Sequence, residues 1–301
     1  MSERNRDYRP LVPGRVLPPW LLLASVDMMS WGVGQVLVKR ATDRLGAVTM
    51  VLFVTLVDGT FYLAAFLGAG QPLAASFSTY AVASLTSAVG IIGYILYFEA
   101  LLRGNVSVVA TITAGSPIIT ILGAIAFLHE TPTAAEALGM ALLVAVILIL
   151  SYEPVGQEWK IPVAVTLSVA ILFLWGIWGI LTKVAVTAPG FGPWQLLLFY
   201  SLSNFTAGVP YYLWRRKRVP SPSPSRGAYA VGAGGFLLLM GGIIASTVAL
   251  SIGDASLVTA VGGCAPVVTS LVAFAFLKEK ATPLRVLAIL LFIPGIVLVA
   301  F

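Results

Sequence analysis

Residues 104–130 read GNVSVVATITAGSPIITILGAIAFLHE, and residues 253–279 read GDASLVTAVGGCAPVVTSLVAFAFLKE. The two stretches align without a gap at an offset of 149, and eleven of their 27 aligned pairs are identical. The identical pairs include two prolines, Pro117 and Pro266, and both stretches end in glutamate. Apolar helices resemble one another in composition, but matched proline and glutamate are not generic choices for a lipid-facing helix. The match therefore indicates that part of the chain is duplicated.

A second pair of stretches supports the duplication. Residues 31–39 read WGVGQVLVK, and residues 175–183 read WGIWGILTK, at an offset of 144. The two matches occur in the same order in both halves, and the Ser-Pro-rich segment at 215–226 can supply the net five extra residues between them. We therefore divide the chain into a polar N-terminal segment, a first repeat, a connecting loop and a second repeat, at 1–17, 18–152, 153–161 and 162–301.

The composition excludes most soluble proteins. The chain has 301 residues, of which 59% are hydrophobic and only 10% are charged, and its mean hydropathy is +0.98. A soluble domain carries roughly 25% charged residues, so lipid must be the solvent of most of this surface. The net charge of +6 comes from short basic clusters between apolar runs, which are typical of membrane-topology signals and not of a nucleic-acid-binding surface. The single cysteine, Cys264, excludes a disulfide framework and a thiolate metal cluster.

Runs of about 20 apolar residues, the length of a helix that crosses ~30 Å of hydrocarbon, recur along the chain. We predict an all-α, polytopic membrane protein of about ten transmembrane helices in two inverted five-helix repeats. The expected spans are 18–40, 47–69, 78–102, 106–128, 133–152, 162–185, 192–214, 228–251, 255–277 and 283–301.

The odd number of spans in each repeat has a consequence for topology. With five spans before it, the second repeat must enter the membrane upside down relative to the first. Inverted repeats are the architecture of secondary transporters, in which two pseudo-symmetric halves meet near the midplane and exchange conformations. The sequence thus predicts a carrier that works by alternating access, with a channel or a non-transporting membrane receptor as the alternative.

An intramembrane enzyme fits the sequence poorly. Aspartyl proteases of membranes carry a Gly-x-Gly-Asp motif, whereas residues 251–254 read SIGD. No Asp-rich cluster suits a magnesium diphosphate, and the lone His129 has no evident partners for a metal site or a nucleophile. We therefore expect no catalytic residues, no cofactor and no metal.

Three features together resemble a known family: two five-helix repeats, a Trp-Gly pair in the first helix of each, and fourth helices that end in Leu-His-Glu or Leu-Lys-Glu. They are similar to the EamA-type ten-helix permeases of the drug/metabolite transporter superfamily. The resemblance covers the chain from Pro18 onward. It implies a multi-pass protein of a bacterial inner membrane that imports or exports a small metabolite, such as an amino acid, an amine or a sugar.

The first helix carries a polar face. Asp27, Trp31, Gln35 and Lys39 are spaced four residues apart, which places them on one slowly drifting side of a helix. Intramembrane polar groups normally face the bundle interior or a wet cavity, so we interpret this face as part of the transport path. Alternatively, Lys39 and its repeat equivalent Lys183 snorkel to the lipid headgroups, Asp27 is interfacial, and the tryptophans only pack.

Asp58 lies near the middle of the second span, with no route for snorkelling. At an offset of 146 it corresponds to Asn204, and Tyr200 lies one turn before Asn204. We expect Asp58 and Asn204 to contribute to a central site; the alternative is a hydrogen bond between helices that fixes packing. A carboxyl group buried at mid-span is also a candidate proton carrier, and the candidates for proton coupling are Asp58, Glu99 and Asp27.

We therefore expect a substrate site built from aromatic and polar side chains of both repeats. Aromatic rings near an acidic group would suit an organic cation through cation–π contacts, whereas hydroxyl groups such as that of Ser246 serve a substrate or the backbone equally well. The predicted substrate-binding residues are Trp31, Gln35, Asp58, Tyr94, Trp175, Trp178, Tyr200, Asn204 and Ser246.

Two prolines, Pro117 and Pro266, occupy the middle of the fourth and ninth spans. Each removes a backbone hydrogen bond and frees a carbonyl one turn earlier. We predict hinges or gates at these symmetric positions, and a static kink that aids packing is the alternative.

The orientation in the membrane stays open. Thirteen Lys and Arg residues lie on the side of the odd-numbered connections and five on the other side, so the positive-inside rule places both termini outside the cytoplasm. The family resemblance implies cytoplasmic termini. Both the positive-inside rule and the resemblance place the two termini on the same side of the membrane. The expected partners are a small-molecule substrate, the lipid bilayer and a proton as candidate coupling ion, with no nucleic acid, and one chain is the expected unit.

Overall fold

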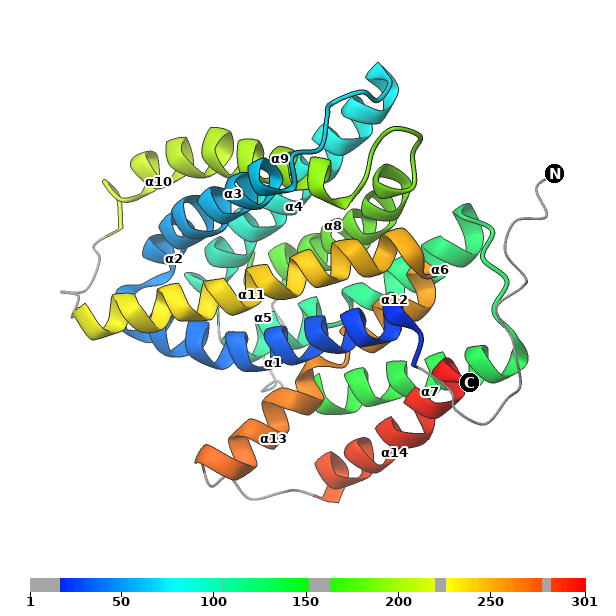
Figure 1. Ribbon diagram of the computed structural model, residues 1–301. Coiled ribbons are helices and arrows are strands. Elements are labelled where there is room, and N and C mark those ends of the chain that lie inside the picture. The colour runs from blue at the N-terminus through cyan, green and yellow to red at the C-terminus, as the bar shows by residue number, and fades with distance from the viewer. Residues whose placement is uncertain (1–16, 105, 152–162, 220–225, 278–282) are drawn as a thin grey trace.

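The structure is a computed structural model that describes residues 17–104, 106–151, 163–219, 226–277 and 283–301. All regular secondary structure in these ranges is helical, which confirms the predicted fold class. Six helices in the described ranges are long and apolar enough to cross a membrane, and shorter apolar helices accompany them. The helices form a bundle in which α1 and α11 lie side by side through the centre (Figure 1).

The first repeat opens with one long helix, and two of its other spans are interrupted. The span after α1 joins two α-helical pieces through a π-helical turn, η1, and the fourth span is broken into α5 and α6. The elements are α1 (Pro19–Leu45), α2 (Ala47–Phe53), η1 (Val54–Asp58), α3 (Gly59–Ala69), α4 (Phe77–Leu101), α5 (Val106–Thr113), α6 (Ser116–Phe127) and α7 (Ala134–Ser151).

The second repeat has the same plan, with a π-helical turn in its second span and a break in its fourth. The elements are α8 (Val163–Val186), α9 (Pro193–Ser203), η2 (Asn204–Gly208), α10 (Val209–Arg215), α11 (Arg226–Ile252), α12 (Ala255–Gly262), α13 (Ala265–Leu277) and α14 (Pro283–Ala300). Each expected span has its helical counterpart, with ends that differ by a few residues.

The breaks in the fourth and ninth spans lie directly before the two prolines. Pro117 and Pro266 are each the second residue of the helix after the break, in α6 and α13. A proline at this position needs no hydrogen bond from its own nitrogen, but it cannot continue a helix from the preceding turn. The sequence predicted a kink here, and the structure shows a helix divided in two.

Contacts between the two repeats occur as equivalent pairs. Thr120 Oγ1 donates a hydrogen bond to the carbonyl of Gly176 at 2.9 Å, and Thr269 Oγ1 donates one to the carbonyl of Gly32 at 3.0 Å. Thr269 follows Thr120 by 149 residues and Gly176 follows Gly32 by 144, so the two bonds are repeat equivalents. Likewise α1 packs along α11 as α8 packs along α4. Paired exchange of this kind is what a two-fold pseudo-symmetry axis produces.

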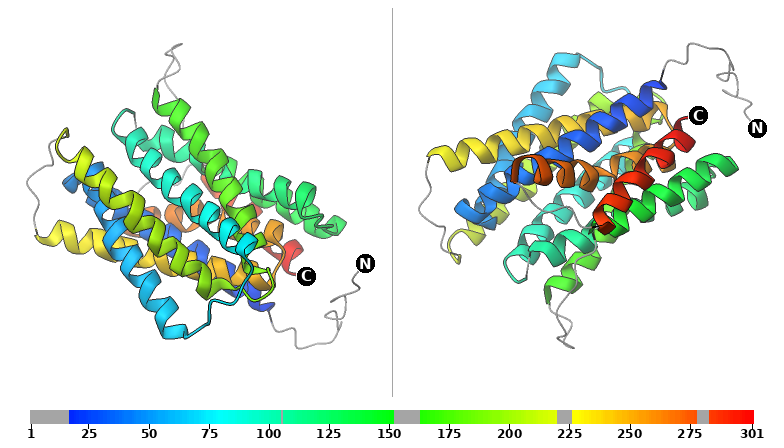
Figure 2. Two further views of the ribbon diagram at one scale, coloured as in Figure 1. Left: turned by 90° about the horizontal axis from the view of Figure 1, so that it is seen from above. Right: turned by 90° about the horizontal axis from the view of Figure 1, so that it is seen from below.

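The first helices of the two repeats start at opposite ends of the bundle. The beginning of α1 and the end of α14 lie at one end, which we call the terminal end, while α8 begins at the other, which we call the distal end (Figures 1 and 2). Since each repeat has five spans, this arrangement is the predicted inverted duplication.

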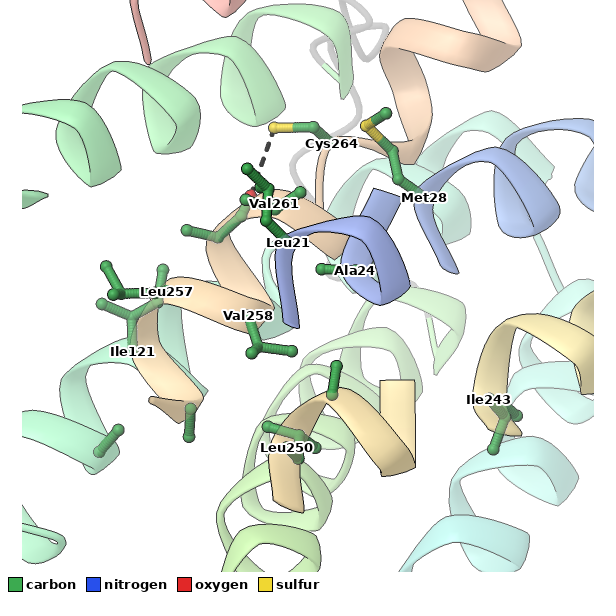
Figure 3. Close-up of a cluster of buried hydrophobic side chains, with 14 of the residues drawn as sticks. Leu21, Ala24, Met28, Ile121, Ile243, Leu250, Leu257, Val258, Val261 and Cys264 are labelled. Atoms are coloured by element: carbon green, nitrogen blue, oxygen red, sulfur yellow. Dashed lines mark hydrogen bonds between the residues drawn. The ribbon is translucent and has the colours of Figure 1, made fainter. Parts of the chain in front are cut away.

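An apolar cluster fills the terminal end of the bundle. Its side chains come from the start of α1, the end of α11, the start of α12 and α6. Figure 3 shows part of this cluster. The members drawn there include Leu21, Ala24, Ile121, Leu250, Leu257 and Val258. All six are nearly or fully buried, so this end is packed solid with apolar side chains.

Candidate functional site

A cavity of about 550 Å³ lies between the two repeats. Both repeats contribute to its wall, and both proline breaks reach it. On α1 its lining runs from Asp27 to the exposed Asp43 near the distal end, and no residue of α1 before Asp27 takes part. The cavity therefore extends from the middle of the bundle to the distal end, and the apolar cluster closes it from the terminal end.

The predicted polar face of α1 forms one wall of this cavity. Asp27, Trp31, Gln35 and Lys39 all line it, as does Asp43, the next residue at the same spacing. The spacing of four residues is the reason why one helix presents them all in one direction. Lys39 is exposed near the mouth.

Nearly all predicted site residues meet at this cavity. The substrate-binding candidates among its lining residues are Trp31, Gln35, Asp58, Tyr94, Trp175, Trp178, Tyr200, Asn204 and Ser246. The proton-coupling candidates Asp27 and Asp58 and the hinge candidates Pro117 and Pro266 also line it. What each residue does there stays a prediction.

Glu99 is not among the residues that line the cavity. Its carboxylate forms an ion pair with Arg215 Nε at 2.6 Å and a second ion pair with Arg103, and it accepts a hydrogen bond from the Tyr211 hydroxyl. This network joins the distal ends of α4 and α10. Glu99 thus has two cationic partners, in contrast to the two aspartates of the cavity.

Two tryptophans of the cavity wall sit over glycines at equivalent places. A Cβ atom at Gly93 would overlap the indole of Trp175, and a Cβ atom at Gly242 would lie 2.8 Å from Cδ1 of Trp31. The two tryptophans are 144 residues apart and the two glycines 149. Each indole ring therefore fits only because the facing helix has a glycine at that position.

One turn further along, the two repeats differ. Trp178 packs against Gly90, where a Cβ atom would lie 3.1 Å from its ring, and the equivalent contact joins Gly34 to Leu239. In the first contact the large side chain, Trp178, is on α8. In the equivalent contact the large side chain, Leu239, is on α11, and α1 contributes the glycine. Trp178 therefore lines the cavity without a counterpart in the first repeat.

The π-helical turns carry two of the predicted residues. Asp58 ends η1 and Asn204 begins η2, and these turns start 150 residues apart, so the two side chains are not at equivalent places in the turns. Asn204 Nδ2 donates to the carbonyl of Val54 at 3.2 Å, and Ser201 Oγ donates to that of Gly59 at 2.7 Å. A π-turn disrupts the regular backbone ladder, and these side chains of the other repeat satisfy carbonyls at η1.

Four buried polar atoms of the wall have no hydrogen-bond partner among the described residues. They are Oδ1 of Asp27, Oδ1 of Asp58 and the hydroxyl groups of Tyr62 and Tyr94, and all four residues line the cavity. Asp27 is 8% and Asp58 only 1% exposed. Unpartnered buried polar groups are rare and costly in proteins, so their concentration in one cavity makes it the candidate binding site.

Polar contacts hold the terminal end closed. Lys183 Nζ donates to the carbonyls of Leu250 at 2.9 Å and Gly253 at 2.7 Å, at the end of α11. Glu130 accepts from the backbone nitrogens of Ala255 at 2.6 Å and Ser256 at 2.9 Å, and from the Ser256 hydroxyl, at the start of α12. We call these contacts of Lys183 and Glu130 with the α11–α12 turn the clamp.

Both charges of the clamp suit their helix ends. A cation stabilises the carbonyl end of a helix, and a carboxylate stabilises its amino end. Asp254 lies in the same turn, where burial raises the pKa of its carboxyl above the usual range and the Glu130 carboxylate adds to the shift.

Tyr62 was not among the residues predicted from the sequence, although its position is informative. It follows Asp58 by four residues, so the two side chains lie on one face of the helix. Tyr62 is buried and its ring centroid lies 5.7 Å from that of Tyr200. A search for residues one turn away from Asp58 would have found it.

The comparisons with known proteins agree with this arrangement. The model of the EamA-like transporter family matches residues 18–152 and again residues 162–301. The chain belongs to the EamA-like transporter family. This family lies within the drug/metabolite transporter superfamily, and its members are membrane transporters, which makes this EamA-like protein a multi-pass membrane transporter.

A solved structure described as "Crystal structure of protein" shares the fold of this EamA-like chain. The TM-score is 0.74 at 16% sequence identity, over 93% of this chain and 95% of that chain. The comparison with curated proteins gave no significant match.

Proposed function

We propose that this EamA-like protein is a secondary carrier, which moves a small metabolite through the central cavity by alternating access between its inverted repeats. One observation carries the proposal. The two ends of the cavity have the same lysine, leucine and glycine, yet these residues adopt different arrangements.

The repeat offsets give the distal equivalent of the clamp. Lys39 corresponds to Lys183 at an offset of 144, and Leu101 and Gly104 correspond to Leu250 and Gly253 at an offset of 149. The residue types are identical in each pair. The equivalent of Glu130 is Glu279, which lies outside the described residues.

At the distal end these residues are apart. Lys39 is exposed and lines the cavity, and in the described part of the chain it donates no hydrogen bond to the carbonyls of Leu101 and Gly104. Lys183, by contrast, is half-buried and donates to both equivalent carbonyls. The same interaction is thus made at one end of a two-fold arrangement and absent at the other.

Exchange of the two arrangements would convert the cavity from distal access to terminal access. The pseudo-symmetry provides a second state of comparable energy, since each repeat would adopt the conformation of the other. The break before Pro117 divides the span that precedes Glu130, the break before Pro266 is its repeat equivalent, and both prolines line the cavity. We propose these breaks as the hinges.

The proposed carrier acts in a bacterial inner membrane, as the family resemblance implies. One chain encloses the whole cavity, which supports a monomer as the working unit. Asp58 is the proposed proton carrier, with Asp27 as the second candidate, because both are buried in the cavity wall without an ionic partner among the described residues. Glu99, with its two arginines, is the weakest of the three candidates.

Transport assays in proteoliposomes test this function. A thermal-shift screen of purified protein against amines, amino acids, sugars and nucleosides would first identify a solute that stabilises the folded state. A carrier predicts saturable counterflow of that solute. Flux that rises linearly with concentration, accompanied by ionic conductance, would indicate a channel instead.

Proton coupling has its own test. Asp58→Asn keeps the size and the hydrogen-bonding capacity of the side chain but cannot release a proton. We expect this variant to lose solute accumulation driven by a pH gradient while it retains counterflow at saturating solute concentrations, because counterflow needs no net proton movement. Accumulation at the wild-type level would eliminate Asp58 as the proton carrier.

A further inference from the structure

The inner part of the cavity has acidic groups without basic partners. The ionisable Asp, Glu, Lys, Arg and His residues among the cavity-lining residues are Asp27, Asp43, Asp58 and Lys39. Lys39 and Asp43 are exposed near the distal mouth, whereas Asp27 and Asp58 are buried. A ligand that reaches the middle of the bundle therefore meets two carboxyl groups and no basic side chain of the described residues.

The two carboxyl groups belong to the wall of the same cavity. Asp27, Asp58, Tyr62 and Tyr94 all line it. Each of these four residues has a buried polar atom without a partner among the described residues. A ligand with several hydrogen-bond donors can pair with both carboxyl groups, and an ammonium group with its three N–H bonds has this capacity.

Two glycines, Gly242 and Gly262, leave space for the carboxyl group of Asp27. A Cβ atom at Gly242 of α11 would lie 3.0 Å from its Oδ1, and one at Gly262 of α12 would lie 2.5 Å from its Oδ2. Ser246, the predicted hydroxyl group of α11, lines the same cavity. The carboxyl group is thus held in place between two helices, while Oδ1 stays without a partner.

Aromatic rings surround the same space. The ring centroids of Trp178 and Tyr200 lie 6.0 Å apart, and those of Tyr94 and Trp175 lie 5.4 Å apart. Electron-rich ring faces attract organic cations and pack against apolar bodies. A cavity that combines carboxyl groups with aromatic rings favours a cationic ligand that has an apolar part.

We infer that Asp27 and Asp58 form the binding site for the ammonium group of an organic amine, whose apolar part packs against Trp178, Tyr200 and the other rings of the wall. This inference rests on the proposed carrier function and narrows it from small metabolites in general to cationic amines. A free carboxylate on the ligand would meet Asp27 and Asp58 with like charge, which disfavours amino acids and organic acids.

Three probes that each have one phenyl ring and two carbons between the ring and the ionic group test the ligand class: β-phenethylamine, L-phenylalanine and 3-phenylpropionate. Binding to the purified full-length protein in nanodiscs is measured by calorimetry. We expect the amine to bind about 10- to 100-fold more tightly than the amino acid, the range that charge-assisted hydrogen bonds give, and the acid to bind more weakly than both. Equal or tighter binding of the amino acid or the acid, or no saturable binding of the amine, would overturn the inference.

Variants test the two aspartates. Asp27→Asn and Asp58→Asn should each weaken amine binding about tenfold or more, and Asp58→Glu should restore part of the affinity lost in Asp58→Asn. Without ligand, the Asn variants should be at least as heat-stable as the wild type, because an unpartnered buried carboxylate is removed. A purely structural role predicts the reverse, lower stability. Glu136→Gln, at a half-buried site outside the cavity, is the control and should bind the amine normally.

Two experiments distinguish a failure of the amine inference from a failure of the proposed carrier function. Cysteine labelling at the two ends of the cavity, described at the end of the Discussion, needs no ligand. If the two ends alternate but the amine does not bind, the amine class is wrong and the carrier stands. If the ends do not alternate, the carrier itself is wrong.

Discussion

The two ends of the cavity contain the same lysine, the same leucine and the same glycine, but only the terminal end is closed. Lys183 donates to the carbonyls of Leu250 and Gly253 there, whereas Lys39 is exposed at the distal mouth. The lysine, the leucine and the glycine are identical at the two ends, so these three residue types do not account for the difference. In the proposed carrier, the difference reflects which end the pseudo-symmetric halves have closed.

The largest predicted effect comes from Glu130, which accepts two backbone hydrogen bonds and one hydroxyl hydrogen bond at the start of α12. Glu130→Ala should lower the free energy of local opening at the α11–α12 turn by about 3–5 kcal/mol, because charged groups make the stronger hydrogen bonds. Hydrogen–deuterium exchange of amides 253–256 should then accelerate roughly 100-fold or more. Glu136→Ala, at the same end on α7, should not change exchange there. Equal protection in Glu130→Ala and the wild type would show that the clamp does not hold this end.

A pair of lysine variants sharpens the comparison. Lys183→Met keeps the length of the side chain but leaves two carbonyls at the end of α11 without their charged donor, which should cost about 1.5–3 kcal/mol of local stability. Lys39→Met removes the equivalent lysine at the open end and should leave amide protection at the end of α11 unchanged. If the two variants change exchange at residues 250–253 equally, the clamp is not specific to the closed end.

The glycine contacts test the symmetry itself. A Cβ atom would lie 2.9 Å from the carbonyl oxygen of Ala265 at Gly32 and 3.0 Å from that of Ser116 at Gly176. Gly32→Ala and Gly176→Ala should therefore each destabilise the fold by about 1–3 kcal/mol, seen as a lower melting temperature in detergent. Gly241→Ala, where a Cβ atom meets no atom within 4 Å, is the control. A large effect at only one of the two equivalent glycines would argue against equal packing of the repeats.

The smallest predicted effect concerns the two equivalent threonine bonds. Thr120→Val and Thr269→Val each remove one hydrogen bond to a glycine carbonyl. Hydrogen bonds between helices in membranes contribute about 0.6 kcal/mol on average, so both variants should lower stability slightly and by the same amount. Steric trapping in bicelles can measure such differences. Unequal losses would mean that the two contacts differ in the lipid environment.

Much of the fold could be predicted from the sequence because its signals are local. Apolar runs of the length of a membrane helix marked the spans, and the matched Pro117 and Pro266 marked the two breaks. The four-residue spacing from Asp27 to Lys39 placed one wall of the cavity correctly. These features depend only on helix geometry and on the solvent.

Other features depend on residues far apart in the chain. Glu99 is paired with Arg215, 116 residues away, and no periodicity in either helix indicates that pair. The π-helical turns shift the register of the second and seventh spans, so the offset of 146 between Asp58 and Asn204 does not relate equivalent places in η1 and η2. Which end is closed could not be predicted either, since a lysine stands at the same repeat position at both ends.

Labelling of two equivalent cysteines tests alternating access most directly. Thr42 lines the open cavity, and Val186, its equivalent at an offset of 144, is buried at the terminal end. In a Cys264→Ala background in nanodiscs, where both faces are accessible, maleimide should modify Thr42→Cys quickly and Val186→Cys slowly. Adding Glu130→Ala should reverse this order, with faster labelling at 186 and slower labelling at 42. If labelling at 186 rises while labelling at 42 is unchanged, or neither site responds, the two ends are not coupled and the carrier account is contradicted.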